Sequence, residues 1–330
     1  MEQHARVDCK PSTADSYSVQ IRHHLKSLAH IALRDLRKTH VLDWKGAQLA
    51  LGERSSASVR YSLNVLKGAL KKAIDWNLVE VNAAQGVKVK IFDKDRFEAK
   101  PFNREEVRQL LAGTKEDRYQ ALWATAVATG ARQGELLSLR WEDVDLERKV
   151  VRIRYTLARV KGKGLVLQSP KTRRSKRDVY LQGFAVESLQ RHKEEQEFQK
   201  SIAAYWDNRG FIFTTKDGSP CDGANIWRAY TDACKEAGLR KTRFHDLRHS
   251  CATMALMSGA NMKTISEQLG HTSILMTADR YGHVLEESRR DVAARLESFI
   301  GPETKTEPQT EQNAEIAPIA GVSATPQLRL

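Results

Sequence analysis

The sequence predicts a mainly α-helical protein with two domains and a small antiparallel β-sheet in the second domain. Three observations predict this fold class. Apolar residues recur at helical spacing along most of the chain. Three short β-like runs lie close together in the second half, at residues 150–157, 165–168 and 177–181. A charged, weakly periodic stretch at residues 85–100 separates the two helical regions, and we interpret it as a linker.

The first helical region contains two patterns. Apolar residues recur at helical spacing from Ser16 to about Gln48, and a longer helical pattern follows Ser55 and Ser56. The apolar positions of the longer pattern are Val59, Leu63, Leu66, Leu70 and Ile74.

The second helical region opens with a helix start. Asn103 followed by Glu105 and Glu106 is typical of an N-cap with acidic residues in the first helical turn. The spacing predicts helices over residues 104–112 and 118–129. The β-like runs come next, and after them the pattern is again mostly helical as far as Ile300. The predicted breaks in that pattern are at residues 208–223, Gly238, Gly259 and Gly270.

The last segment of the chain differs in composition from the rest. Residues 301–330 hold no aromatic residue and four of the eight prolines. We expect this tail to be disordered, because it cannot bury enough apolar surface to offset its ordering entropy. The expected organisation is a flexible N-terminus (1–15), a helical domain (16–84), a linker (85–100), a second domain (101–300) and a disordered tail (301–330).

Basic residues exceed acidic ones in both expected domains. The chain of 330 residues has a formal charge of +13. Basic and acidic residues number 17 and 11 in residues 1–99, 35 and 26 in residues 100–300, and 2 and 4 in residues 301–330. This excess points to a polyanionic partner such as nucleic acid.

The sequence also carries signals of location. No apolar run approaches the roughly 18–20 residues that a membrane span needs, and the N-terminus lacks the apolar core of a signal peptide. We therefore expect a cytoplasmic protein with no membrane partner. The four cysteines form no CxxC pair, which favours reduced thiols.

Four segments of the second domain carry residues suited to phosphodiester chemistry. They are TGARQGELLSL (129–139), SPKTRRSKRDVYL (169–181), HDLRHS (245–250) and LGHTSILMTADRYGH (269–283). Together they supply six candidate catalytic residues, Arg132, Lys171, His245, Arg248, His271 and Tyr281.

These residue types have a coherent chemical use together. Two guanidiniums suit the charge that develops on a phosphate under attack, because each planar fork donates bidentate hydrogen bonds and stays charged. A tyrosine can act as a covalent nucleophile once nearby cations stabilise its phenolate. A lysine can protonate the departing oxygen, and histidines can position or exchange protons.

A zinc pair is a competing interpretation of His245 and His249, which are four residues apart. Arg248 lies between them, no general-base glutamate follows the first histidine, and no cysteine lies at ligand spacing, so the sequence argues against zinc. The sequence also has no phosphate-binding glycine loop and no paired carboxylates at metal spacing. We therefore expect neither a cofactor nor a metal.

The order of these motifs resembles that of the tyrosine recombinases of the phage integrase family. The family pattern has an arginine in a T-G-x-R-x-x-E-L helix start, a lysine in a β-hairpin, an H-x-L-R-H helix, an L-G-H turn and a downstream tyrosine. The matching positions are 129–136, Lys171-Thr172, 245–249, 269–271 and Tyr281. The resemblance covers residues 16–295, since residues 17–84 resemble the family's helical, SAM-like core-binding domain.

The resemblance implies how the reaction would run. Arg132 and Arg248 would bind the scissile phosphate. Tyr281 would attack it, giving a 3′-phosphotyrosyl link and a free 5′-hydroxyl.

The same resemblance implies roles for the other motif residues. Lys171 would be the general acid for the leaving 5′-oxygen, and His245 and His271 would hydrogen-bond the phosphate and assist proton transfer. Glu135 matches an acidic position, and we expect a buried carboxylate that braces an arginine. His249 is expected to be structural or to support the site from behind. A basic cluster is expected to contact the DNA backbone: Lys171, Arg173, Arg174, Lys176 and Arg177.

The implied fold is a two-domain clamp on double-stranded DNA that carries attachment or core sites, with residues 101–300 as the catalytic domain. Family members hold paired DNA sites in a homotetramer, and accessory DNA-bending or directionality proteins would be further partners. The amphipathic segment 285–300 would be either a helix docked on the neighbouring protomer or a helix packed on its own domain.

We therefore expect a site-specific DNA recombinase or integrase of a phage or other mobile element, acting in the cytoplasm at the nucleoid. Three alternatives stay open. They are a Xer-type chromosome resolvase, a type IB topoisomerase-like enzyme that relaxes DNA without pairing two sites, and a catalytically silent DNA-binding protein. The complete set of six residues argues against the last, because a binder has no need of the tyrosine.

Overall fold

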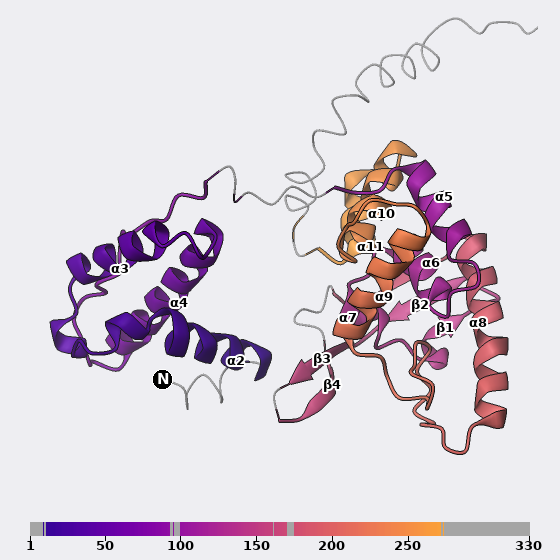
Figure 1. Cartoon of the computed structure of the whole chain (residues 1–330), viewed down its shortest axis with the longest axis horizontal. Helices are drawn as coiled ribbons and strands as arrows, with labels where there is room; N and C mark the ends of the chain where they lie inside the picture. Colours follow the sequence, from indigo (N-terminus) through magenta and orange to yellow (C-terminus); the bar gives the residue numbers. More distant parts are fainter. Residues whose placement is uncertain are drawn as a thin grey trace, which may run out of the picture. The chain divides into compact units, whose positions relative to one another are not determined.

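The computed structural model describes residues 9, 11–92, 95, 100–160, 162–169, 175–271 and 273 (Figure 1). Lys171, Tyr281, the amphipathic segment 285–300 and the expected tail 301–330 lie outside these described residues. Among the helices of the described part, none is long and apolar enough to cross a membrane.

The first helical region combines long helices with short turns. Its elements are α2 (Pro11–Val19), the π-helix η1 (Gln20–His24), the 3-10 helices η2 (Lys26–Leu28) and η3 (Leu33–Asp35), α3 (Lys38–Ala50) and α4 (Ser56–Asp75). α4 confirms the long helix predicted after Ser55, whose Oγ caps it by accepting a 3.2 Å hydrogen bond from the backbone N of Ser58. α2 begins within the residues expected to be flexible.

The apolar pattern from Ser16 to Gln48 does not form one helix. Polar contacts fix the interruption between α2 and α3. Gln20, only 9% exposed in the π-helix, accepts a 2.7 Å hydrogen bond from Ser62 Oγ of α4. Trp44 Nε1 of α3 donates a 2.9 Å bond to the backbone carbonyl of His24. The spacing of apolar residues could not predict this interruption, because polar side chains and a backbone carbonyl make the contacts.

The core of the first region extends into the stretch that the sequence presents as a linker. Val87 and Val89 are buried in the same cluster as the apolar faces of α3 and α4. Lys67 Nζ donates a 2.6 Å hydrogen bond to the carbonyl of Val87, and Phe92 N donates one of 3.1 Å to Ser56 Oγ. Residues 85–92 therefore pack on this region, because the valines alternate with lysines and share one face.

The strands of the second region form two small antiparallel sheets. The strands are β1 (Val144–Asp145), β2 (Val150–Ile153), β3 (Thr156–Val160), β4 (Gly164–Gln168) and β5 (Arg177–Tyr180). One sheet has the order β1-β2-β5, and the other pairs β3 with β4. The antiparallel pairing is as predicted, but the single predicted sheet is two.

The predicted run 150–157 is wrong as one strand, because its two halves pair with different strands. Ile153 at the end of β2 pairs with Arg177 of β5, whereas Thr156 at the start of β3 pairs with Gln168 of β4. Arg154 lies at the break, where its Nη1 donates a 2.9 Å hydrogen bond to the carbonyl of Arg177. The β3–β4 hairpin leaves the three-stranded sheet at this point (Figure 1).

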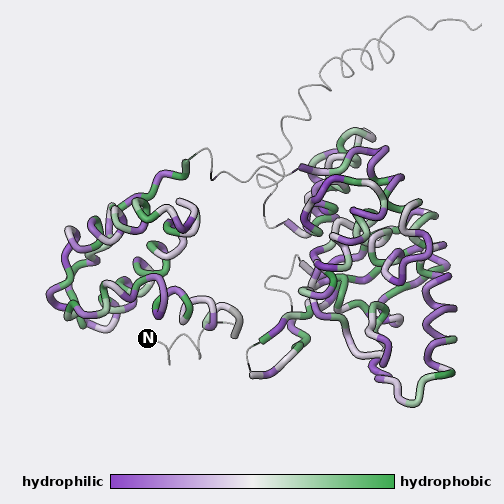
Figure 2. Tube along the Cα trace, viewed as in Figure 1, coloured by the Kyte–Doolittle hydropathy of each residue, from purple (hydrophilic) through white to green (hydrophobic). Residues whose placement is uncertain are grey.

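The other described elements of the second region are helices. They are α5 (Arg104–Gly113), α6 (Gln120–Thr129), α7 (Gln133–Leu136), η5 (Trp141–Asp143), α8 (Gly183–Ile202), α9 (Gly223–Glu236), α10 (Asp246–Met257) and α11 (Met262–Leu269). The predicted start at Asn103 is confirmed by a capping box, in which Asn103 Oδ1 accepts from Glu106 N and Glu106 Oε2 accepts from Asn103 N, at 2.8 and 2.9 Å. The outer helix α8 is largely hydrophilic (Figure 2).

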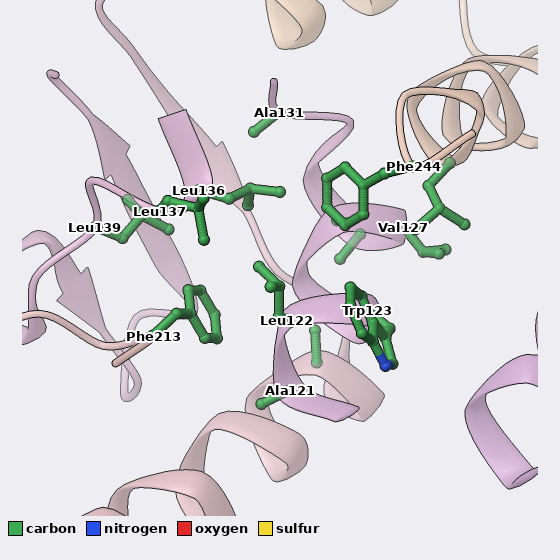
Figure 3. Close-up of a cluster of buried hydrophobic side chains, with 14 of the residues drawn as sticks. Ala121, Leu122, Trp123, Val127, Ala131, Leu136, Leu137, Leu139, Phe213 and Phe244 are labelled. Atoms are coloured by element: carbon green, nitrogen blue, oxygen red, sulfur yellow. The ribbon is translucent and has the colours of Figure 1, made fainter. Parts of the chain in front are cut away.

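The core of the second region is built around α6, which is buried along its whole length. Leu122 and Trp123 are both fully buried and point to different sides of the helix, with Phe213 on the side of Leu122 (Figure 3). The rings of Trp123 and Phe244 lie 5.7 Å apart in an edge arrangement. Because this packing surrounds α6, it fixes the end of the helix, where the first candidate motif begins.

Candidate active site

The first motif begins where α6 ends. Gly130 caps the helix in the left-handed conformation, with φ of 60°. A Cβ on Gly130 would lie 2.5 Å from Leu269 Cδ2 and 3.2 Å from Cys251 Sγ. Glycine is therefore required both for the backbone angle and for the close approach of α10 and α11 to this turn.

Arg132 lies directly after this turn, at the N-cap of α7. Its backbone N donates to Glu135 Oε2 at 3.0 Å and its Nη1 to Glu135 Oε1 at 2.8 Å. Its Nη2 donates a 3.3 Å bond to the carbonyl of Gly270. The side chain is braced on two sides yet keeps 41% of its surface exposed, so it can reach a ligand.

Glu135 is the buried carboxylate that the sequence predicts, but it braces two arginines. It is 4% exposed, and its Oε2 also accepts a 2.9 Å bond from Nη2 of Arg177. Burial alone would raise the pKa of Glu135. The charge and hydrogen bond of Arg177, with the contacts of Arg132, outweigh burial and hold the pKa below its ordinary value.

Arg248 approaches the same turn from α10. It is 3% exposed, and its Nη1 donates a 2.7 Å bond to the carbonyl of Gly130. The neighbouring Asp246 accepts hydrogen bonds from the backbone N and Nη2 of Arg243, at 2.9 and 2.8 Å, at the start of α10. His249, which we expect to be structural or to support the site residues, is 2% exposed.

His245 stands at the N-cap of α10 and is exposed. Partial burial of its ring, followed by the positive charges of neighbouring arginines that include Arg248 and Arg132, lowers its pKa to about 4. His245 is therefore neutral near pH 7 and can donate one hydrogen bond and accept another. Because Arg132 and Arg248 both act on this ring, the three side chains belong to one electrostatic cluster.

His271 follows the end of α11. Gly270 has φ of 66°, its N donates to the carbonyl of Glu267, and His271 N donates to the carbonyl of Ser266, both at 3.0 Å. This pair of bonds is a Schellman motif, which explains the glycine of the L-G-H pattern. His271 is 7% exposed, and the Gly270 carbonyl beside it accepts the bond from Arg132.

Three of the six candidate residues therefore gather around two glycine turns: Arg132, Arg248 and His271. A fourth, His245, lies at the N-cap of α10, three residues before Arg248. The other two, Lys171 and Tyr281, lie outside the described residues. In the part of the chain that is described, no group of three or more His, Cys, Asp or Glu side chains could hold a metal ion. The rings of His245 and His249 stand nearly perpendicular, 5.3 Å apart.

Comparison with known proteins identifies the family. Residues 100–288 match the family model described as the phage integrase family. This chain belongs to that family. The tyrosine recombinases that form it cleave and rejoin DNA through a tyrosine intermediate.

Relatives of this phage integrase family member cover most of its length. It is 30% identical over 313 residues to a tyrosine recombinase XerC-like protein of Caldanaerobacter subterraneus subsp. tengcongensis, covering 89% of this chain and 80% of the relative. It is 28% identical over 317 residues to the integrase of Staphylococcus phage L54a, covering 88% of each. The fold resembles that of the Tn1549 transposon integrase in complex with a circular intermediate DNA. That likeness has a TM-score of 0.75 and 20% identity, and covers 89% of this chain and 96% of the other.

The prediction made from the sequence was wrong for one residue of the site. Arg177 was expected to contact the DNA backbone, but it is only 8% exposed and pairs with Glu135. The signal was present in the sequence. Arg177 and Val179 of β5 and the following Leu181 are buried, whereas Asp178 and Tyr180 between them are exposed. The period of two places the arginine on the inner face.

Proposed function

We propose that this phage integrase family member is a site-specific DNA recombinase of a phage or other mobile element. The observation that carries the proposal is the convergence of Arg132, Arg248 and His271 around the turns at Gly130 and Gly270, with His245 three residues before Arg248 at the N-cap of α10. This arrangement supports a phosphate site made of two guanidiniums and two imidazoles.

The two arginines bind the scissile phosphate in complementary ways. Arg248 is buried and fixed by the Gly130 carbonyl, whereas Arg132 is braced from behind and partly exposed. Fixed, permanently charged forks stabilise the oxygens of a pentacoordinate phosphorane without reorganising during the reaction. His245, neutral near pH 7, donates a further hydrogen bond to a nonbridging oxygen.

Tyr281 is the nucleophile in this proposal. Its phenolate oxygen forms a bond to the scissile phosphorus as the bond from phosphorus to the 5′-oxygen breaks. Lys171 gives a proton to the departing oxygen, so the products are a 3′-phosphotyrosyl protein and a free 5′-hydroxyl. Nothing in this step consumes a cofactor, and EDTA should leave it unchanged.

Strand exchange is the reverse of cleavage with a new partner. The covalent link conserves the phosphodiester, so a 5′-hydroxyl of a second strand attacks the phosphotyrosyl phosphorus and releases Tyr281. This requires two DNA sites held together. We therefore propose a homotetramer on paired double-stranded attachment or core sites, with accessory DNA-bending or directionality proteins and a cytoplasmic, nucleoid-associated location.

The domain roles form part of the proposal. The buried cluster of the first helical region and the one around α6 are separate hydrophobic cores, which supports two DNA-contacting units. We assign residues 16–84 as the core-binding domain, to which residues 85–92 add their packed valines, and residues 101–300 as the catalytic domain. The excess of basic residues in both supports contacts with the phosphate backbone.

A Xer-type chromosome resolvase is the second candidate, and the XerC-like relative favours it. The phage integrase relative and the transposon integrase with the same fold favour the mobile element. The two candidates share their chemistry and differ in the DNA sites that they pair.

A two-site exchange assay tests the proposal. Two labelled duplexes made from the DNA that flanks the gene are incubated with the full chain, with and without EDTA. Recombinant products of mixed length, formed equally with EDTA, are expected. Exchange only on a chromosomal resolution site would support the resolvase, and relaxation of supercoiled DNA without exchange would support a topoisomerase. Binding without cleavage on any of these DNAs would contradict an enzymatic function.

A further inference from the structure

We propose that Arg177 is a positioning residue that fixes Arg132 and the turn carrying His271 relative to one another. The inference rests on the proposed function, because it gives Arg177 a role in that same phosphate site. It assigns to Arg177 a task other than contact with DNA.

Arg177 ties together three segments that are distant in sequence. Its Nη2 donates to Glu135 Oε2 at 2.9 Å, and its Nε donates to the carbonyl of Gln268 at 2.5 Å. Its Nη1 donates to the carbonyl of Ser175 at 3.1 Å. A planar guanidinium can reach acceptors in three directions at once, whereas a lysine ammonium is a single point on a flexible stem.

The first of these contacts reaches Arg132 through one shared carboxylate. Glu135 holds Arg177 on Oε2, and it holds Arg132 through both oxygens, at 2.8 Å to Nη1 and 3.0 Å to the backbone N. Glu135 is buried, so its position is set by these partners. A shift of Arg177 therefore moves the group that orients the Arg132 fork.

The second contact reaches the turn that carries His271. Gln268 lies in the last turn of α11, and Gly270 follows that helix. A Cβ on Gly270 would lie 2.9 Å from Arg177 Nη1, so the turn packs directly on the guanidinium. The Gly270 carbonyl in turn accepts the 3.3 Å bond from Arg132 Nη2. The contacts form a closed ring, from Arg177 through Glu135 and Arg132 to Gly270 and back.

The charges of this ring explain why a second arginine is needed. Glu135 keeps its negative charge, because its pKa is held below the ordinary value. Paired with Arg132 alone, it would cancel the positive charge that Arg132 offers to a phosphate. With Arg177 present, the three groups carry a net charge of +1, and the exposed member of the group is Arg132.

Arg177→Lys is the decisive variant, with Arg177→Met as the harsher change. The measurements are the first-order rate of covalent adduct formation on a saturating nicked suicide duplex, the Kd for the intact duplex, and the dependence of that Kd on salt. The rate should fall about 10- to 100-fold, as expected when a reacting group is misplaced by about 1 Å. The Kd and its salt slope should stay within about twofold, because a buried arginine neutralises no phosphate.

Arg154→Met is the matched control. Arg154 also holds β5, through the Arg177 carbonyl and an ion pair with Asp178, but no contact joins it to Glu135 among the described residues. Its variant should cleave at the wild-type rate. Equal slowing in Arg154→Met would contradict the proposal, since loosening β5 would then suffice. A change in Kd and salt slope without a change in rate would also contradict it, because that result marks a DNA contact.

The Glu135→Gln/Arg177→Met double variant keeps the proposal testable if Arg177→Met folds poorly, because it removes both buried charges together. If Arg177 acts through Glu135, the double variant forms the adduct at about the rate of Glu135→Gln alone, a comparison that needs no Arg177→Met single variant. A double variant much slower than Glu135→Gln would overturn the proposal. If the wild type itself formed no adduct, that result would contradict the proposed function instead. Failure of the Arg177 proposal and failure of the proposed function can therefore be distinguished.

Discussion

Arg248 Nη1 donates a 2.7 Å hydrogen bond to the backbone carbonyl of Gly130, which is 118 residues earlier in the chain. This bond joins the two arginine motifs of the candidate site through main chain rather than through a side chain. The carbonyl is available in this direction because Gly130 ends α6 in the left-handed conformation. The backbone of one motif therefore positions the side chain of the other.

Gly130→Ala should destabilise the protein by about 2–4 kcal/mol, because alanine is strained at this φ and its Cβ would overlap Leu269. Urea unfolding measures the change. Gly68→Ala is the matched control, since nothing lies within 4 Å of a Cβ there, and it should stabilise α4 by about 0.5–1 kcal/mol. Equal stability of the two variants would show that the turn at Gly130 tolerates a side chain.

Glu135→Gln should lower the free energy of unfolding at pH 7 by about 2–4 kcal/mol, because it leaves Arg177 buried without its carboxylate. The folded pKa of Glu135 is lowered, so its contribution is present above the unfolded value of 4.5 and is lost as pH falls through the folded pKa. The difference in stability between wild type and variant should therefore begin to shrink as pH falls below 4.5. A difference that stays constant from pH 7 to pH 3 would rule out this linkage.

His245 should make the protein less stable in mild acid. Its pKa is about 4 in the folded protein, against an ordinary value of 6.5 in an unfolded chain, so the unfolded chain binds the proton more readily between these values. The stability present above pH 6.5 is lost as pH falls toward 4. Unfolding measured at about pH 7 and about pH 4.5 should show a smaller drop in His245→Gln than in wild type. An identical drop would mean that His245 titrates normally in the folded protein.

Much of the fold follows from local patterns in the sequence. The capping box at Asn103, the helix after Ser55 and the Leu-Gly-His turn each have a local cause, so short-range reasoning finds them. The split between β2 and β3 could not be predicted in this way. It depends on which distant strand pairs with each half, and apolar alternation within 150–157 carries no information about partners.

In the candidate site, too, some features follow from local sequence motifs and others depend on tertiary packing. The sequence motifs place Arg132, Arg248 and His271, and the structure brings them together. The ring that joins Arg177 to Glu135 and the Gly270 turn depends on which face of β5 lies inward. The local excess of basic residues suggested that Arg177 is solvated. Its two-residue spacing from the apolar Val179 was the better indicator, because it places both side chains on the same, buried face of β5.

Covalent capture of DNA tests the central claim most directly. A labelled suicide duplex with a nick beside the cleavage site is incubated with wild type and with Tyr281→Phe, and each mixture is boiled in detergent before electrophoresis. Wild type should give a protein–DNA adduct that protease treatment removes. Tyr281→Phe should bind the intact duplex with unchanged Kd and give no adduct. An equal adduct from Tyr281→Phe, or none from wild type on a DNA that it binds, would contradict the account.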